Sequence, residues 1–193
     1  MIRSLYDWTF SLAAHRNALW VLALVSFIES SVFPIPPDVL LIPMVLAARE
    51  KAWLIAGVCT LASVLGGMAG YALGYFAFEE IGRPILEFYG KAGRFEEFRL
   101  WYNDWGDWAV FFAGVTPFPY KVITILSGVT GLDLGVFTLS SIAARALRFF
   151  LVAALLWRFG PPVRDFIEKR LGLFFTLGVV LLFGGFLAAR YAL

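Results

Sequence analysis

Five ionisable side chains occur within otherwise apolar stretches of this 193-residue chain. They are two acids and three bases: Glu29, Asp38, Lys121, Arg145 and Arg148. A charge at mid-depth in a bilayer costs on the order of 2.5–3.5 kcal/mol, so each group is expected to have partners or water. Two acids against three bases leave a formal charge of +1 if all are ionised. Such a cluster suits an anionic ligand, such as a phosphate headgroup, or tunes one acid for proton exchange.

Each of these charges also has a structural explanation, and the sequence leaves both open. Asp38 directly follows two prolines and could favour a helix N-terminus, where an acid is stabilised by the dipole. Lys121 does not fit that role, although a salt bridge to Asp38 would be purely structural. Arg145 and Arg148 share one helix face and could simply pair with the acids. Glu29 could anchor a hairpin or carry a proton.

A proline-centred motif that occurs twice must position these groups. Residues 32–39 read Val-Phe-Pro-Ile-Pro-Pro-Asp-Val, and residues 115–122, 83 positions later, read Val-Thr-Pro-Phe-Pro-Tyr-Lys-Val. Proline removes a backbone donor and clashes with the preceding turn, so each copy should break a helix. Paired breaks in two halves of a membrane protein often mark a transport site. The predicted breaks are at Pro34, Pro36, Pro37, Pro117 and Pro119.

The apolar stretches around the motifs predict the fold. With 61% hydrophobic residues and a mean hydropathy of +0.80, the chain is an integral membrane protein. The stretches 17–48 and 108–132 suit hairpins, because a bilayer crossing takes about 20 helical residues. We therefore predict an all-α inverted repeat of re-entrant hairpin plus transmembrane helix, with an additional C-terminal transmembrane helix. The single membrane domain, 1–193, would comprise an N-terminal amphipathic helix 1–16, a first repeat 17–78, an interfacial segment 79–107, a second repeat 108–158 and a final span 171–190.

Two further patterns concern packing and the membrane surface. Gly66, Gly70 and Gly74 recur every four residues, a small-residue stripe that lets another helix approach closely. Aromatic residues at helical spacing follow in the interfacial segment, interleaved with charges, and indicate a helix in the headgroup layer. These aromatic residues are Phe95, Phe98, Trp101, Tyr102 and Trp105.

Several classes of function are unsupported by the sequence. The chain has one His and one Cys, His15 and Cys59, so we expect no metal site, and an internal disulfide cannot form. No nucleotide loop or hydrolytic triad occurs, so we expect no cofactor, no enzymatic activity and no nucleic-acid partner. Lys and Arg number eight on one predicted side and five on the other, which favours a cytoplasmic N-terminus and an outside C-terminus. No cleavage site follows the first apolar run, so we expect the N-terminus to be uncleaved.

Three blocks of the sequence together resemble the DedA family, also called SNARE-associated or VTT-domain proteins, and most closely its YqaA-like bacterial branch. The blocks are residues 29–43, the glycine-rich residues 65–74, and residues 116–128, which begin Thr-Pro-Phe-Pro-Tyr-Lys. The resemblance implies a bacterial inner-membrane protein with two opposed re-entrant hairpins. It also implies a role in lipid translocation, often linked to the proton gradient.

The resemblance implies site residues as well. Glu29 and Asp38 match the type of the family's two essential acids, although they are closer together here. The family's Arg-x-x-Pro-x-x-Arg pattern is absent, Lys121 is the nearest base, and Arg145 and Arg148 would supply positive charge from the adjacent helix. Arg and Lys grip phosphate differently, so this departure bears on the substrate.

The sequence therefore predicts a transporter or flippase of a lipid with an anionic headgroup, a phospholipid or a polyprenyl phosphate, with membrane lipids as partners and protons as a candidate coupling ion. One alternative is a proton-coupled transporter of a small ion or cationic drug. Another is a membrane-organising protein that transports nothing. The oligomeric state and the headgroup are left open.

Overall fold

The computed structural model describes residues 17–32, 36–116 and 118–160, and all regular elements within them are helices. The protein is thus a helical membrane protein. The predicted N-terminal helix 1–16, the final span 171–190, Pro34 and Pro117 lie outside the described residues.

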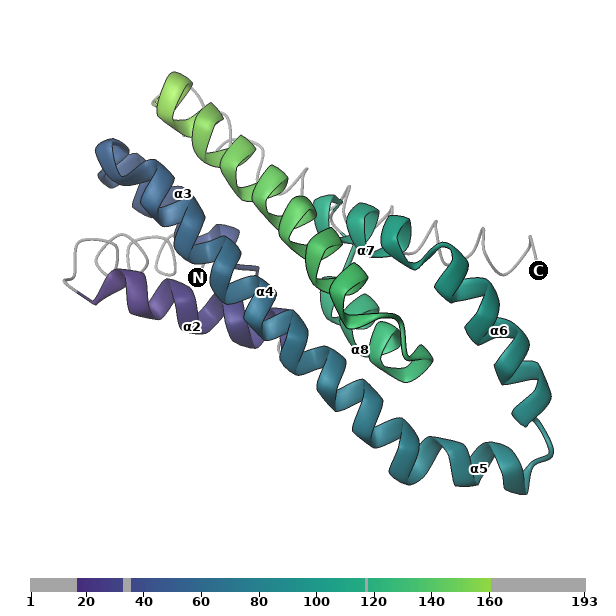
Figure 1. Cartoon of the computed structure of the whole chain (residues 1–193). Helices are drawn as coiled ribbons and strands as arrows, with labels where there is room; N and C mark the ends of the chain where they lie inside the picture. The colour runs from purple at the N-terminus through teal and green to yellow at the C-terminus, as the bar shows by residue number, and fades with distance from the viewer. Residues whose placement is uncertain (1–16, 33–35, 117, 161–193) are drawn as a thin grey trace, which may run out of the picture.

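The first broken helix pair consists of α2 (Ala18–Ser31) and α3 (Asp38–Ala47). Helix α2 runs toward the middle of the molecule, and α3 returns from there toward the end at which α2 began (Figure 1). Pro37 is the N-cap residue of α3, so the second helix starts directly after the proline pair. A 3-10 turn (η1, Arg49–Lys51) then reverses the chain.

The longest helix follows this turn. Helix α4 (Ala52–Ala77) has 26 residues, which at 1.5 Å per residue is about 39 Å, against roughly 30 Å for the hydrocarbon core of a bilayer. It continues through a π-helical turn, η2 (Phe78–Gly82), into α5 (Arg83–Phe88), so that Arg49–Phe88 is one helical rod of 40 residues.

The predicted interfacial segment 79–107 contains a sharp turn rather than one straight element. Gly90 has φ +64°, a conformation that suits glycine, and it separates α5 from α6 (Ala92–Asp104). Helix α6 carries four of the five aromatic residues singled out above, and the fifth, Trp105, directly follows it.

The second broken helix pair is α7 (Gly106–Val115) and α8 (Tyr120–Thr130). Helix α8 ends at Gly131, whose φ of +64° allows the N–H of Leu132 to reach the carbonyl oxygen of Ser127 at 3.0 Å. This glycine cap satisfies carbonyls that the helix end would otherwise leave open. A long helix, Leu134–Gly160, follows at once and is the second helix long and apolar enough to cross a membrane.

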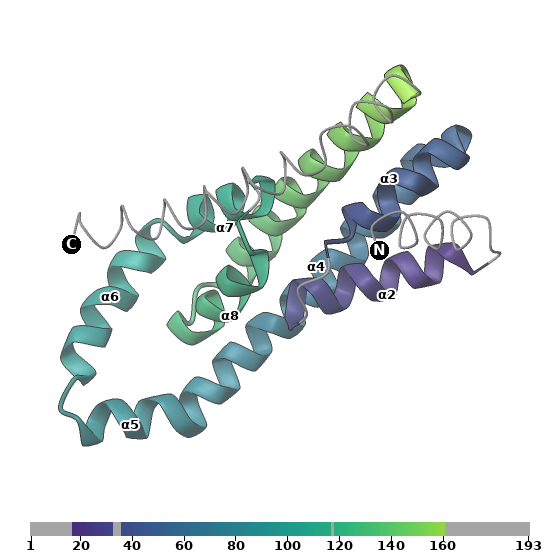
Figure 2. The same cartoon turned by 180° about the vertical axis from the view of Figure 1, so that it is seen from behind.

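The two long helices run in opposite directions, as Figures 1 and 2 both show. The end of the second long helix lies beside the start of the first, because a Cβ atom added at Gly160 would meet the Arg49 guanidinium. Each long helix is therefore preceded by its own broken pair, and the pairs enter from opposite ends of the molecule.

Three glycines on α4 hold these parts together. A Cβ atom on Gly66 would collide with the carbonyl of Phe27 in α2, and one on Gly74 would collide with the carbonyl of Ile125 in α8. Gly70 lies between them and faces both helices, through the Ser30 carbonyl and the Thr124 hydroxyl. Helices α2 and α8 thus meet end to end along α4, and the close approach needs residues without side chains.

Candidate functional site: two ion pairs where the broken helices meet

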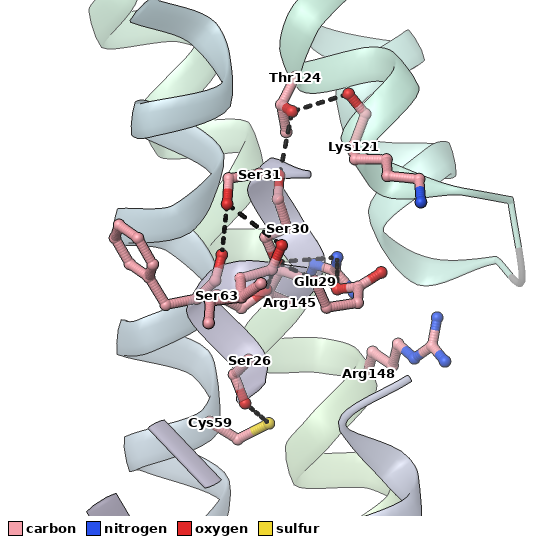
Figure 3. A network of polar contacts seen from close by, with 12 residues as sticks. Ser26, Glu29, Ser30, Ser31, Cys59, Ser63, Lys121, Thr124, Arg145 and Arg148 are labelled. Atoms are coloured by element: carbon pink, nitrogen blue, oxygen red, sulfur yellow. Dashed lines mark hydrogen bonds and ion pairs between the residues drawn. The ribbon is translucent and has the colours of Figure 1, made fainter. Parts of the chain in front are cut away.

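The five intramembrane charges come from four elements and gather where the broken pairs meet; Figure 3 shows four of them, and Asp38 contacts Arg148. Glu29 is near the end of α2, Asp38 is the first residue of α3, and Lys121 is the second residue of α8. Arg145 and Arg148 lie on the long helix Leu134–Gly160. The structure therefore places all five predicted site residues in one region, and it pairs the two arginines with the two acids, which is one of the two alternatives left open by the sequence.

The first ion pair joins Arg145 to Glu29. Nη2 of Arg145 lies 3.3 Å from Oε2 of Glu29, and the side chains are 2% and 15% exposed. Burial of this degree is unusual for arginine, and it requires a neutralising partner because an isolated buried charge is very costly.

A chain of hydroxyl groups extends this pair onto α4. Ser30 Oγ donates to Oε2 of Glu29 at 3.2 Å, and Ser63 Oγ lies 2.7 Å from Ser30 Oγ. Arg145 also donates to Ser30 Oγ at 3.5 Å, a long contact. With the Ser30 proton directed at Glu29, the Ser63 hydroxyl must donate to Ser30. The carboxylate is thus held by α2, α4 and the long helix together.

Aromatic rings complete the surroundings of Arg145. The guanidinium carbon lies 3.8 Å from the centroid of the Tyr120 ring and 5.5 Å from that of Phe149. A desolvated cation over an aromatic face gains on the order of 2 kcal/mol. Tyr120 begins α8, so this stacking ties the second broken pair to the buried charge.

The second ion pair joins Arg148 to Asp38 and is more open. Nη2 of Arg148 lies 2.7 Å from Oδ2 of Asp38, and the side chains are 23% and 20% exposed. The other terminal nitrogen, Nη1, donates to the carbonyl oxygen of Thr116 at 3.0 Å. One guanidinium therefore contacts both broken pairs, α3 through a side chain and the α7–α8 connection through the backbone.

Asp38 does not behave as a capping residue here. Helix α3 has no side-chain hydrogen bond at its N-terminus, and Asp38 faces Arg148 rather than Lys121. The salt bridge between Asp38 and Lys121 considered above is therefore not formed. The acid still lies in the first turn of α3, where the helix dipole favours it.

Lys121 is the one of the five charges that has no partner among the described residues. It is half-buried, and among the described residues its side chain has no ion pair or hydrogen bond. Figure 3 shows its ammonium group directed toward the region of Glu29 and Arg148. Because each arginine is matched by one acid, the formal charge of +1 expected from the sequence resides on Lys121.

Several polar residues of this region were not singled out from the sequence. Ser30, Ser63, Thr116 and Tyr120 all contact one of the charged side chains or a hydroxyl bound to one. Thr116 and Tyr120 stand inside the second proline motif, and Ser30 follows Glu29 directly, so proximity in sequence was a usable signal for three of them. Ser63 was not recognisable, because only the packing of α2 on α4 brings it close. The described residues contain no group of side chains that could hold a metal ion.

Comparison with known proteins identifies the family. The sequence profile of the VTT domain matches residues 35–158, which include α3, α4, α7, α8 and all but the last two residues of the helix Leu134–Gly160, while α2 precedes the match. The chain belongs to the VTT-domain family. This family is the DedA or SNARE-associated family whose three blocks were recognised in the sequence. Other VTT-domain proteins are similar over most of the chain, but their names assign no activity.

A protein of Haemophilus influenzae, described as an uncharacterized protein, is 39% identical over 86% of this chain and 88% of its own length. A protein of Histophilus somni, also described as uncharacterized, is 41% identical over the same shares. No solved structure matches the chain.

Proposed function

We propose that this VTT-domain protein moves a lipid with an anionic headgroup across the membrane. Membership of a family often linked to transport or flippase roles supports a transport function. The main supporting observation is Lys121, which has no ion pair among the described residues and points toward the region of Arg148, an arginine that contacts both broken pairs (Figure 3). An excess positive charge in a membrane interior has a functional explanation more often than a structural one.

The architecture that we propose is an inverted repeat. Helices α2 and α3 would form one re-entrant hairpin before α4, and α7 and α8 would form the other before Leu134–Gly160. Supporting this, the two long helices run in opposite directions (Figure 1). A hairpin that stops at mid-depth must be surrounded by protein or water, which fits the meeting of α2 and α8 on α4. Such repeats can rock about a central site and expose it to either side in turn.

In this proposal the headgroup phosphate binds Lys121 and replaces one of the present partners of Arg148. Lys121 would attract the phosphate as a point charge, and Arg148 would exchange its Thr116 carbonyl contact for a phosphate oxygen. Protonation of Asp38 would free Arg148 further, and this would couple lipid binding to a proton. Arg145 and Glu29 would stay paired with each other and would support the positions of Arg148 and Lys121.

The proposed location is a bacterial inner membrane, with the N-terminus in the cytoplasm and the C-terminus outside. The excess of Lys and Arg on the predicted cytoplasmic side supports this orientation. A reporter fused to the C-terminus should be silent in the cytoplasm, and a cytoplasmic signal would reverse the orientation without affecting the proposed site.

The test is reconstitution of the purified protein in liposomes that carry a labelled phospholipid or a polyprenyl phosphate, with and without a pH gradient. Lipid movement above that of protein-free vesicles is expected, together with its loss in Lys121→Gln. A matched control is Lys91→Gln, a charge at the turn before α6 that is exposed and far along the chain from the site. If no lipid moves under any condition, the lipid proposal fails.

A further inference from the structure

A cleft separate from the two ion pairs is lined by residues of η2, α5, α6 and the end of α8. Figure 1 shows how α5 and α6 turn around the end of α8. The volume of the cleft is about 560 Å³, within the range of small-molecule sites. The π-helical turn of η2 forms part of its wall, and such turns are frequent at functional sites. None of the five site residues described above lines this cleft.

The charged side chains of the cleft leave a negative excess. Three carboxylates and two guanidinium groups line it, which gives a formal charge of −1; they are Glu79, Glu87, Glu96, Arg83 and Arg99.

Both arginines are already engaged. Arg83 lies 2.7 Å from Glu79, and Arg99 contacts both oxygens of Glu96, the shortest distance being 2.6 Å. The hydrogen bonds that Arg99 donates to Glu96 raise the pKa of the Arg99 guanidinium. Glu87 has no ion pair among the described residues.

Two further features of the lining favour a cation. The last turn of α8, Gly128–Thr130, and the following Gly131 border the cleft, and the C-terminal end of a helix carries partial negative charge on its carbonyl oxygens. Aromatic rings form another part of the wall: Phe78 stacks on Phe95 with centroids 4.5 Å apart, and Tyr75 lines the same space. Cations are attracted to the faces of such rings.

The lining of the cleft suits an organic cation better than a metal ion. The described residues contain no group of acids, cysteines or histidines arranged to hold a metal, whereas an alkylammonium group would use the Glu87 carboxylate, the partial negative charge of the helix end and the aromatic rings together. We propose that this cleft binds an alkylammonium group, either on a lipid headgroup or on a free amine. The cleft is separate from the proposed lipid-transport site, so a failure of the transport proposal would not affect the proposal of ammonium binding.

The experiment measures binding of ethylammonium to the full-length protein in detergent, by saturation-transfer NMR, with glycerol phosphate as the anionic probe. Wild-type protein should bind ethylammonium and not glycerol phosphate. Glu87→Gln should raise the dissociation constant about twofold to fivefold, because this factor corresponds to the free energy of one exposed ion pair. Phe95→Leu should raise it by a similar factor, since a cation–π contact at an exposed site has a comparable strength.

Glu97→Gln is the matched control, because Glu97 is an exposed acid on the next helix, α6, and does not line the cleft. Its affinity should equal that of wild type. The proposal is overturned if wild type does not bind ethylammonium, if glycerol phosphate binds equally well, or if Glu87→Gln and Glu97→Gln behave alike.

A second arm distinguishes the two sources of the ammonium group. The protein is placed in nanodiscs made of equal parts phosphatidylethanolamine and phosphatidylglycerol, and the retained lipids are identified by native mass spectrometry. Preferential retention of phosphatidylethanolamine, lost in Glu87→Gln, assigns the cleft to a lipid headgroup. Equal retention, with ethylammonium binding intact, assigns it to a free amine.

Discussion

The two ion pairs of the site differ in ways that separate a structural role from a ligand-exchanging one. Glu29–Arg145 is long, at 3.3 Å, but it is deeply buried, stacked on Tyr120 and linked to α4 by two serines. Asp38–Arg148 is short, at 2.7 Å, yet about a fifth of each side chain is exposed. The shorter pair is thus the more accessible one.

This difference shows that distance alone is a poor guide to the role of an ion pair. A buried charge that loses its partner cannot be rescued by water, so the Glu29–Arg145 pair is costly to open. The Asp38–Arg148 pair can exchange partners with a ligand or with water at little cost, because solvent screens exposed charges. We therefore propose that the first pair holds the helices together and that the second, with Lys121, binds the ligand.

The largest effect should follow from breaking the buried pair. Arg145→Leu leaves the Glu29 carboxylate uncompensated and should lower the free energy of unfolding by about 3–5 kcal/mol. Unfolding of the detergent-solubilised protein, followed by circular dichroism, measures this loss. The double variant Glu29→Gln with Arg145→Leu should recover part of it, since no lone charge remains. Equal stability of Arg145→Leu and wild type would refute the structural role.

Removing the ring beneath Arg145 should have the next largest effect. Tyr120→Leu loses the cation–π contact and leaves a gap in the core, at a cost of about 2–4 kcal/mol. Tyr120→Phe keeps the ring and should be destabilised by less than about 1 kcal/mol, because the hydroxyl group has no hydrogen-bond partner among the described residues. The same unfolding assay applies, and equal loss in the two variants would show that the ring is not what holds Arg145.

The open pair should contribute less to stability. Arg148→Ala is expected to change the free energy of unfolding by about 1 kcal/mol, in line with partly exposed pairs. A loss as large as that of Arg145→Leu, measured side by side, would remove the distinction between the pairs. Arg148→Lys keeps the charge but not the two-pronged contact to Asp38 and Thr116, so it tests geometry separately from charge.

Lys121→Gln should have the smallest effect on stability, within about 0.5 kcal/mol, because no described residue pairs with this side chain. It should nevertheless weaken binding of an anionic lipid headgroup, measured by lipid retention in native mass spectrometry. Unchanged lipid retention would mean that the excess charge serves some other purpose.

Much of the fold could be predicted from the sequence because the proline motifs and uncharged stretches are local signals. The breaks between α2 and α3 and between α7 and α8 fall at the motifs, and α4 begins at Ala52 as expected. The sharp turn at Gly90 was not foreseen. A positive φ at one glycine leaves no pattern in hydropathy, whereas the aromatic spacing of residues 95–105 predicted the helix that follows the turn, α6.

The site was predictable in its membership and partly in its pairing, because the two arginines could be expected to pair with the two acids. Charges in apolar stretches stand out, so all five residues could be selected from the sequence. Which acid meets which arginine depends on how α2 and α8 abut on α4, and this is fixed by contacts of Gly70 with Ser30 and Thr124 that lie far apart in the chain. The opposed alignment of Asp38 and Lys121 in the two motifs suggested a pair, whereas the long helix supplies the partner of Asp38.

The most direct test compares lipid movement by Arg148→Ala with that by wild type in the same liposomes, with the folded fraction of both proteins checked first. We predict that the folded variant moves no labelled lipid while the exposed-surface control Lys91→Gln moves it at the wild-type rate. Lipid movement by Arg148→Ala at the wild-type rate would contradict the assignment of the open pair to ligand binding.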